Sequence, residues 1–106
     1  MNRTNEDINN MLEDFLGGFD PDEPILVLEG DEFADSCIGL TTDHHLVYDY
    51  DLMVESLAKA YKEEDDTEED ARMKAIEWID YNTLRSLDYM KSSGNVPIII
   101  NRFDNM

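Results

Sequence analysis

The first element of the chain is marked by apolar residues at helical spacing. They recur at intervals of three and four positions on one face: Ile8, Met11, Leu12, Phe15 and Leu16. A hydroxyl at Thr4 is followed three residues later by a carboxylate at Asp7, a variant capping box. Gly17 and Gly18 supply a C-terminal stop. The pattern predicts an N-terminal helix whose other face carries Asn and acidic residues.

Four short apolar stretches predict strands. Pro24 precedes the branched run Ile25–Leu28, which is typical of a strand buried on both faces. Ser36–Thr41 and Leu46–Tyr48 predict a hairpin across an intervening polar turn. Pro97–Ile100 repeats the Pro-plus-branched pattern, so we expect it at the centre of the sheet, beside Ile25–Leu28.

Helical spacing returns in the second half of the chain. A helix is predicted from Asp49–Asp51, where a carboxylate can act as N-cap, to about Glu63. The acidic run Glu63–Asp66 interrupts it, and Thr67–Asp70 is a capping box that begins the next helix. Thr83 is expected to start a further short helix.

The predicted order is α-β-β-β-α-α-(α)-β, an α+β fold. We expect a small antiparallel or mixed sheet of about four strands, with an N-terminal helix and two to three further helices. The 106 residues correspond to one domain, 1–106.

Charge is the most unusual property of the composition. Twenty-six acidic residues against eight Lys and Arg give a formal net charge of −18. Residues 1–35 carry −10, residues 36–66 carry −6 and residues 67–106 only −2. This excess argues against direct binding to nucleic acid or to an anionic bilayer, since both contacts need cations.

The remaining composition predicts a soluble, cytosolic protein. A single cysteine, Cys37, excludes an internal disulfide and fits a reducing compartment. The longest apolar run has four residues, too few to span a membrane, and the first residues do not resemble a signal peptide.

The sequence offers no strong catalytic, metal-binding or cofactor-binding motif. None of the five glycines belongs to a phosphate-binding loop, and no stretch has the spacing of a calcium loop. Cys37 is expected to be a core residue and His44–His45 an exposed turn. We therefore expect a protein that is not an enzyme and needs no metal or cofactor.

Dense negative charge makes mimicry of a nucleic acid a hypothesis. Eighteen charges correspond to about 31 Å of duplex, close to the diameter of roughly 33 Å expected for a compact domain of this size. A basic nucleic-acid-binding protein could then grip this surface in place of phosphates. Selection for solubility, or a high-salt cytoplasm, is the competing explanation.

The acidic clusters supply the candidate partner-binding residues. Phe33 is included as a possible aromatic anchor. The complete set is Asp20, Asp22, Glu23, Glu29, Asp31, Glu32, Phe33 and Asp35, with a second cluster of Glu63, Glu64, Asp65 and Asp66.

Several segments carry a family resemblance over about residues 24–101. They are Pro24–Val27, Ile38–Thr41, Val47–Glu55, Ala75–Leu87 and Pro97–Ile100. In these, the chain resembles a family of small acidic proteins carried by phages, prophages and plasmids of Firmicutes, for which no enzymatic activity is known. The most specific parts are Tyr48–Asp51 and Tyr81–Arg85, where Arg85 is expected to pair with Asp49 or Asp51.

The resemblance implies a counter-defence role by analogy of character. Small acidic proteins of this kind are often anti-CRISPR or anti-restriction proteins, and an anti-CRISPR protein is the reading we prefer for so compact a chain. Its partner would be an RNA-guided CRISPR nuclease, whose PAM-reading groove presents Arg side chains that attract carboxylates.

Two other hypotheses remain open. The protein could be a structural or regulatory phage protein that binds another protein through its Tyr- and Met-bearing helices, with Tyr61 and Met53 in contact. A carboxylate enzyme or metal protein ranks last.

Overall fold

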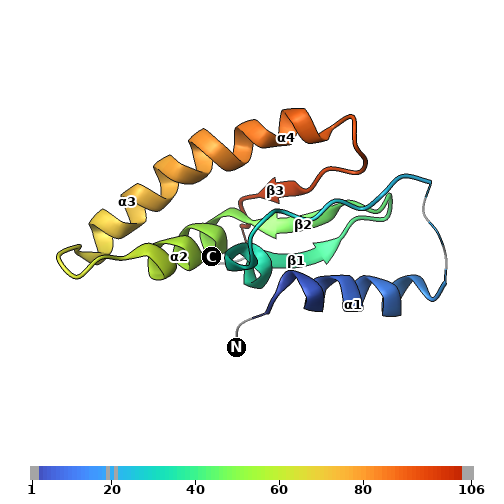
Figure 1. Ribbon diagram of the computed structural model, residues 1–106, viewed down its shortest axis with the longest axis horizontal. Coiled ribbons are helices and arrows are strands. Elements are labelled where there is room, and N and C mark those ends of the chain that lie inside the picture. Colours follow the sequence, from blue (N-terminus) through green and yellow to red (C-terminus); the bar gives the residue numbers. More distant parts are fainter. Residues whose placement is uncertain (1–2, 19, 21, 104–106) are drawn as a thin grey trace.

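The computed structural model describes residues 3–18, 20 and 22–103, which form an α+β fold (Figure 1). A small mixed sheet is combined with four α-helices within those residues. The elements are α1 (Asn5–Leu16), a 3-10 helix η1 (Asp31–Ser36), β1 (Cys37–Leu40), β2 (Leu46–Asp49), α2 (Tyr50–Tyr61), α3 (Glu68–Trp78), a π-helical segment η2 (Ile79–Thr83), α4 (Leu84–Met90) and β3 (Ile98–Ile100).

The sheet has three strands in the order β1-β2-β3. β1 and β2 form the predicted antiparallel hairpin, with an irregular register between Cys37 and Gly39. β3 pairs with β2 in parallel, with Val47 opposite Ile98. The last strand therefore lies at an edge and β2 at the centre, so the prediction of a central final strand is wrong.

The predicted strand Ile25–Leu28 is also wrong. Ile25 forms only an isolated parallel bridge with Asn95, where the Leu26 N–H donates to the Asn95 carbonyl. Two residues later, the Leu28 N–H donates to the side-chain hydroxyl of Tyr48 instead of a strand partner. Ile25 and Val27 pack against the core and Leu28 is buried in it, which accounts for the apolar run.

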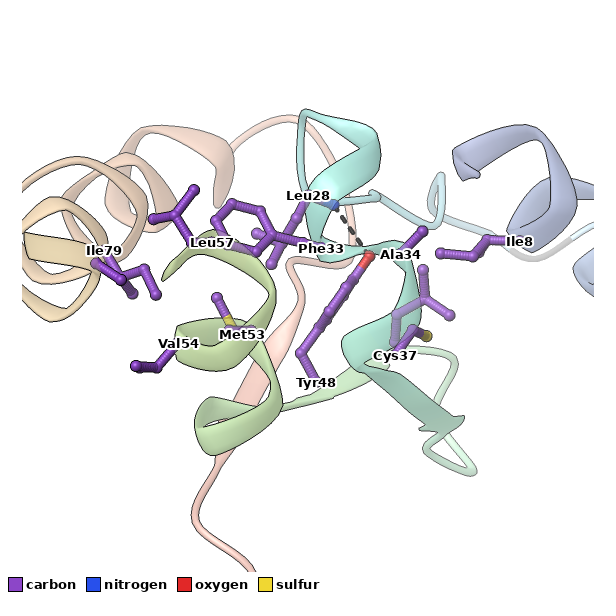
Figure 2. Close-up of a cluster of buried hydrophobic side chains, with 12 residues drawn as sticks. Ile8, Leu28, Phe33, Ala34, Cys37, Tyr48, Met53, Val54, Leu57 and Ile79 are labelled. Atoms are coloured by element: carbon purple, nitrogen blue, oxygen red, sulfur yellow. Dashed lines mark hydrogen bonds between the residues drawn. The ribbon is translucent and has the colours of Figure 1, made fainter. Parts of the chain in front are cut away.

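The core surrounds Tyr48 at the end of β2. Figure 2 shows Phe33 of η1 and Met53 and Leu57 of α2 on one side of its ring, with Ile8 of α1 beyond Ala34 on the other. The hydroxyl of Tyr48 points to the backbone nitrogen of Leu28, 3.2 Å away. One side chain thus connects the sheet with the segment before η1.

The predicted caps of the helices are present. Thr4 and Asp7 form a reciprocal capping box on α1, and Gly17 ends the helix in the left-handed conformation. The carboxylate of Asp49 accepts from the Leu52 N–H and caps α2, while Thr67 caps α3.

The short helix predicted to start at Thr83 is present as α4, whose N-cap position is held by Thr83. The backbone of Thr83 is helical, and α3 continues into α4 through the wider turn η2. In this turn the Leu84 N–H donates to the Ile79 carbonyl five residues back, and the Asn82 side-chain amide donates to the Trp78 carbonyl. Ile79 and Thr83 are both buried, so the π turn directs both side chains towards the core.

Candidate partner-binding surface

The predicted acidic residues are spread along the longest dimension of the molecule. In Figure 1 the segment 22–24 lies at the end near the C-terminus of α1, residues 31–35 lie near the middle, and residues 63–66 lie at the opposite end. That dimension is 48 Å, against 29 Å for the other two. The two predicted clusters are therefore parts of an extended array.

The elongated shape lowers the charge density expected from a compact domain. A net charge of −18 over 48 Å is about one charge per 2.7 Å. A duplex carries about one charge per 1.7 Å. The protein is thus a strongly acidic rod with a lower linear charge density than DNA, and the predicted equality with the duplex is wrong.

Two of the candidate acids hold the N-terminal helix to the rest of the fold. The Asn5 N–H donates to Asp31 Oδ1 at 2.9 Å, and the Arg3 N–H donates to Asp35 Oδ1 at 2.7 Å. The guanidinium of Arg3 also donates to the Cys37 carbonyl, with 2.7 Å between Nη2 and O. Asp31 and Asp35 therefore have structural roles in addition to their charge.

Asp66 has a comparable role at the other end of the molecule. Its carboxylate accepts from the Glu63 N–H at 3.0 Å and from Lys74 Nζ at 2.9 Å. The Glu63 N–H first, and then Lys74, lower the pKa of Asp66 below its ordinary value. Asp66 thus closes the turn between α2 and α3.

The other candidate acids are more available to a partner. Within the part of the chain that the structure describes, exposed carboxylates without a structural contact of this kind occur at Asp20, Asp22, Glu23, Glu29, Glu64 and Asp65. Glu63 is also exposed, while its backbone N–H joins the α2–α3 turn.

Glu32 is half-buried beside a shallow depression of mixed charge. The depression is lined by Asp31, Asp35 and Glu55, and also by Arg3 and Lys59. The middle of the array is therefore partly neutralised by Arg3 and Lys59, as its α2–α3 end is by the Lys74–Asp66 ion pair.

The proposed aromatic anchor is wrong. Phe33 is 1% exposed, and its ring centroid lies 6.2 Å from that of Trp78. η1 is a 3-10 helix that turns Phe33 and Ala34 into the core, while Asp31 remains outside. In this segment, the single aromatic residue among acidic residues marks a position in the core.

Of the two residues predicted to contact a partner through the helices, one is buried and the other is exposed. Met53 is fully buried against the core and cannot contact a partner in this fold, whereas Tyr61 is exposed. Tyr81 and Tyr89 are exposed on the rod formed by η2 and α4.

Arg85 does not form the predicted ion pair. Its guanidinium lies over the ring of Tyr81, 5.0 Å from the centroid. Asp49 pairs with Arg102 instead, and Asp51 lies 3.6 Å from Arg72.

An apolar surface at the N-terminal helix was missed by the sequence reasoning. Met11 and Phe15 belong to the apolar stripe of the predicted helix, and they are 50% and 71% exposed. They line a groove between α1 and β1. The periodicity identified the stripe, but it could not indicate that the fold buries Ile8, covers Leu12 and Leu16 in part and leaves Met11 and Phe15 exposed.

The cysteine and histidine side chains, the candidates for catalysis or metal binding, have structural positions in the fold. Burial raises the pKa of the Cys37 thiol, so this side chain behaves as a core residue. His45 Nδ1 lies 2.7 Å from the Val96 carbonyl oxygen, and His44 adopts a positive φ of 69° in the hairpin turn. Among the described residues, no three His, Cys, Asp or Glu side chains are grouped as a metal site would require.

Comparisons with known protein families, with curated proteins and with solved structures give no match for this chain. In the part of the chain that the structure describes, no helix has the length and apolar character needed to cross a membrane.

Proposed function

We propose that this protein is a non-enzymatic inhibitor that presents carboxylates to a basic, nucleic-acid-binding groove of another protein. The observation that carries the proposal is the array of exposed acids along the 48 Å axis, from Asp22 and Glu23 at one end to Glu64 and Asp65 at the other. A rod of this length and charge can follow a groove that is lined with cations along its course.

The physical basis is competition for the same cations. Lys and Arg that bind phosphates release counterions, and carboxylates can replace those phosphates. The field of an acidic protein also steers a basic partner towards it, which raises the association rate at low salt.

In its more specific form, the proposal makes this an anti-CRISPR protein acting in the cytoplasm of a bacterial host cell. The partner is then an RNA-guided nuclease, and the occupied site is the groove in which Arg side chains read the PAM duplex. The resemblance to small acidic phage proteins of Firmicutes supports this form, whereas the compact shape that favoured it over an anti-restriction protein is not found in a molecule of 48 × 29 × 29 Å.

Cleavage and binding assays on a purified, guide-loaded nuclease test the proposal. We expect the nuclease to be retained on the immobilised protein at about 0.1 M salt and released at about 0.5 M salt. A duplex that contains the PAM should also displace it. Retention at both salt concentrations with DNA still bound would contradict mimicry.

Charge reversal identifies the surface that is used. The double variant Glu29→Lys with Glu64→Lys reverses one exposed acid in each predicted cluster and avoids Asp31, Asp35 and Asp66, which hold the fold together. We expect weaker inhibition and a flatter salt dependence than for Glu77→Lys with Asp88→Lys, a control with the same change in net charge. Equal effects of the two double variants would show that only total charge matters.

A second candidate function is supported by the exposed tyrosines of α2, η2 and α4. In this alternative the protein is a structural or regulatory phage protein that binds another protein through Tyr61, Tyr81 or Tyr89. Its complexes should resist high salt and should weaken when Tyr61 is replaced by Ala.

A further inference from the structure

A groove runs between α1 and β1, beside the acidic array. Met11, Leu12 and Phe15 line it from the helix, and Ile38 and Leu40 line it from the strand. Its volume is about 350 Å³, within the range of sites that hold a ligand or several side chains.

The side chains of this groove are only partly covered by the fold. Ile8, at the start of α1, is buried against the core, but Met11, Phe15 and Ile38 are exposed. The polar contacts described above between α1 and the rest of the molecule involve Arg3 and Asn5, at the beginning of the helix. The second half of α1 therefore presents apolar surface that a bound group could cover.

The charge around the groove selects the kind of partner. α1, which forms one wall of the groove, has four acidic residues and no basic residue: Glu6, Asp7, Glu13 and Asp14. Asp7 and Asp14 lie one helical turn before and after Met11, beside the groove. Arg3 also lines the groove, but its guanidinium pairs with Asp35 and donates to the Cys37 carbonyl. A second copy of this chain would bring another net charge of −18 to the same place, which is unfavourable. A segment that carries Lys or Arg next to apolar side chains complements both the acidic residues of α1 and the apolar lining of the groove.

We propose that the groove between α1 and β1 is the anchoring site for an apolar side chain of a basic partner segment. The inference rests on the proposed function, since it adds an apolar anchor to a surface that attracts cations. In this proposal, Met11 and Phe15 make the apolar contact that was predicted for Phe33, which is buried.

Two peptides separate the electrostatic contribution from the apolar one. Both carry the same number of Lys residues in a Ser/Gly background, and one has Leu where the other has Ser at two central positions. Because burial of a Leu side chain corresponds to about tenfold or more in affinity, we expect the Leu peptide to bind at least tenfold more tightly in fluorescence anisotropy.

Substitution in the groove should remove this difference. In Phe15→Ser the two peptides should bind with equal affinity, while Phe103→Ser, which changes an equally accessible Phe outside the groove, should keep the tenfold preference. Circular dichroism confirms that α1 remains helical in both variants, and Leu12→Ser repeats the test from a second lining position.

Each outcome has a separate meaning. Equal binding of both peptides to the unmodified protein would overturn the groove inference and leave the charge-based function intact. No binding of either peptide at low salt would overturn the proposed function itself. A salt-stabilised dimer in sedimentation that Phe15→Ser dissociates would show that a second copy is the occupant and would overturn the inference.

Discussion

The hydroxyl of Tyr48 connects two segments that no strand pairing joins. It accepts the N–H of Leu28 in a buried position, and burial raises the pKa of Tyr48 to about 12. The ring fills the centre of the core, while the oxygen satisfies a backbone donor that would otherwise be buried without a partner. Such a donor costs about 1–3 kcal/mol when it is left unpaired.

Replacing Tyr48 by Phe should therefore lower the free energy of unfolding by about 1–3 kcal/mol at neutral pH. The unfolded Tyr ionises near pH 10, so the unfolded state binds fewer protons than the native state above that pH. The stabilisation is complete below pH 10 and falls as the pH rises towards 12. By pH 11.5 the unmodified protein should lose about 2 kcal/mol relative to Tyr48→Phe.

Urea unfolding of both proteins at pH 7, 9 and 11.5 measures these differences. Tyr61→Phe is the control, because Tyr61 is exposed. A constant difference between the unmodified protein and Tyr48→Phe across this range would contradict the role assigned to the hydroxyl.

Asp49 performs two tasks that substitutions can separate. Its carboxylate caps α2 through the Leu52 N–H and pairs with Arg102, although the residue is almost completely buried. Asp49→Asn keeps a capping oxygen and removes the charge, whereas Asp49→Ala removes both. We expect Asp49→Ala to be less stable than Asp49→Asn by about 1 kcal/mol in thermal unfolding. Equal stabilities would show that the cap contributes little.

At the scale of elements, the attachment of α1 depends on a few contacts at one end. The guanidinium of Arg3 donates to the Cys37 carbonyl, and the Arg3 backbone donates to Asp35. The second half of the helix keeps an exposed apolar face. α1 is therefore expected to open locally at a lower free energy than the core.

Arg3→Ala should make this opening easier. We expect amide hydrogen exchange in α1 to accelerate about tenfold, since loss of a charge-assisted hydrogen bond corresponds to about 1.5 kcal/mol. Exchange in β2 and α2 should be unchanged. Arg85→Ala, which removes a guanidinium from the surface of α4, is the control. Uniform acceleration over the whole chain would instead indicate a loss of global stability.

The helices could be predicted because their signals are local. Capping residues and the three-to-four spacing act within one turn, and the bounds of α1 and α2 follow from Thr4, Gly17 and Asp49. The segment Ile25–Leu28 was mistaken for a strand because an apolar run reports burial and not hydrogen-bond partners. Only the fold shows that a Tyr side chain takes the place of a strand.

The candidate site could be predicted only in part for the same reason. Sequence identifies every carboxylate, but not which of them are occupied by internal donors, as Asp31, Asp35 and Asp66 are. It identifies the apolar stripe of α1, but not that Phe15 stays outside the core. Residues distant in the chain decide which carboxylates accept internal hydrogen bonds and which apolar side chains are covered.

At the scale of the whole molecule, self-repulsion should limit stability at low salt. A net charge of −18 within 48 × 29 × 29 Å places many carboxylates within one Debye length, about 30 Å at 0.01 M salt but only about 10 Å at 0.1 M. Added salt screens this repulsion, whereas it weakens ordinary surface ion pairs.

The melting temperature should therefore rise with sodium chloride between about 0.01 and 0.5 M. Differential scanning fluorimetry measures the effect. The increase should be smaller for Glu29→Lys with Glu64→Lys, because this variant carries less net negative charge. A melting temperature that falls with salt would show that ion pairs such as Lys74–Asp66 outweigh the repulsion.

The parallel pairing of β3 with β2 has a consequence for synthesis on the ribosome. Val47 pairs with Ile98, so β2 leaves the exit tunnel about fifty residues before its partner. At about 5–20 residues per second, the nascent β2 keeps an open hydrogen-bonding edge for several seconds. During that interval, residues 1–66 carry a net charge of −16. We expect this charge to keep neighbouring unfinished chains on a polysome apart until the sheet is complete.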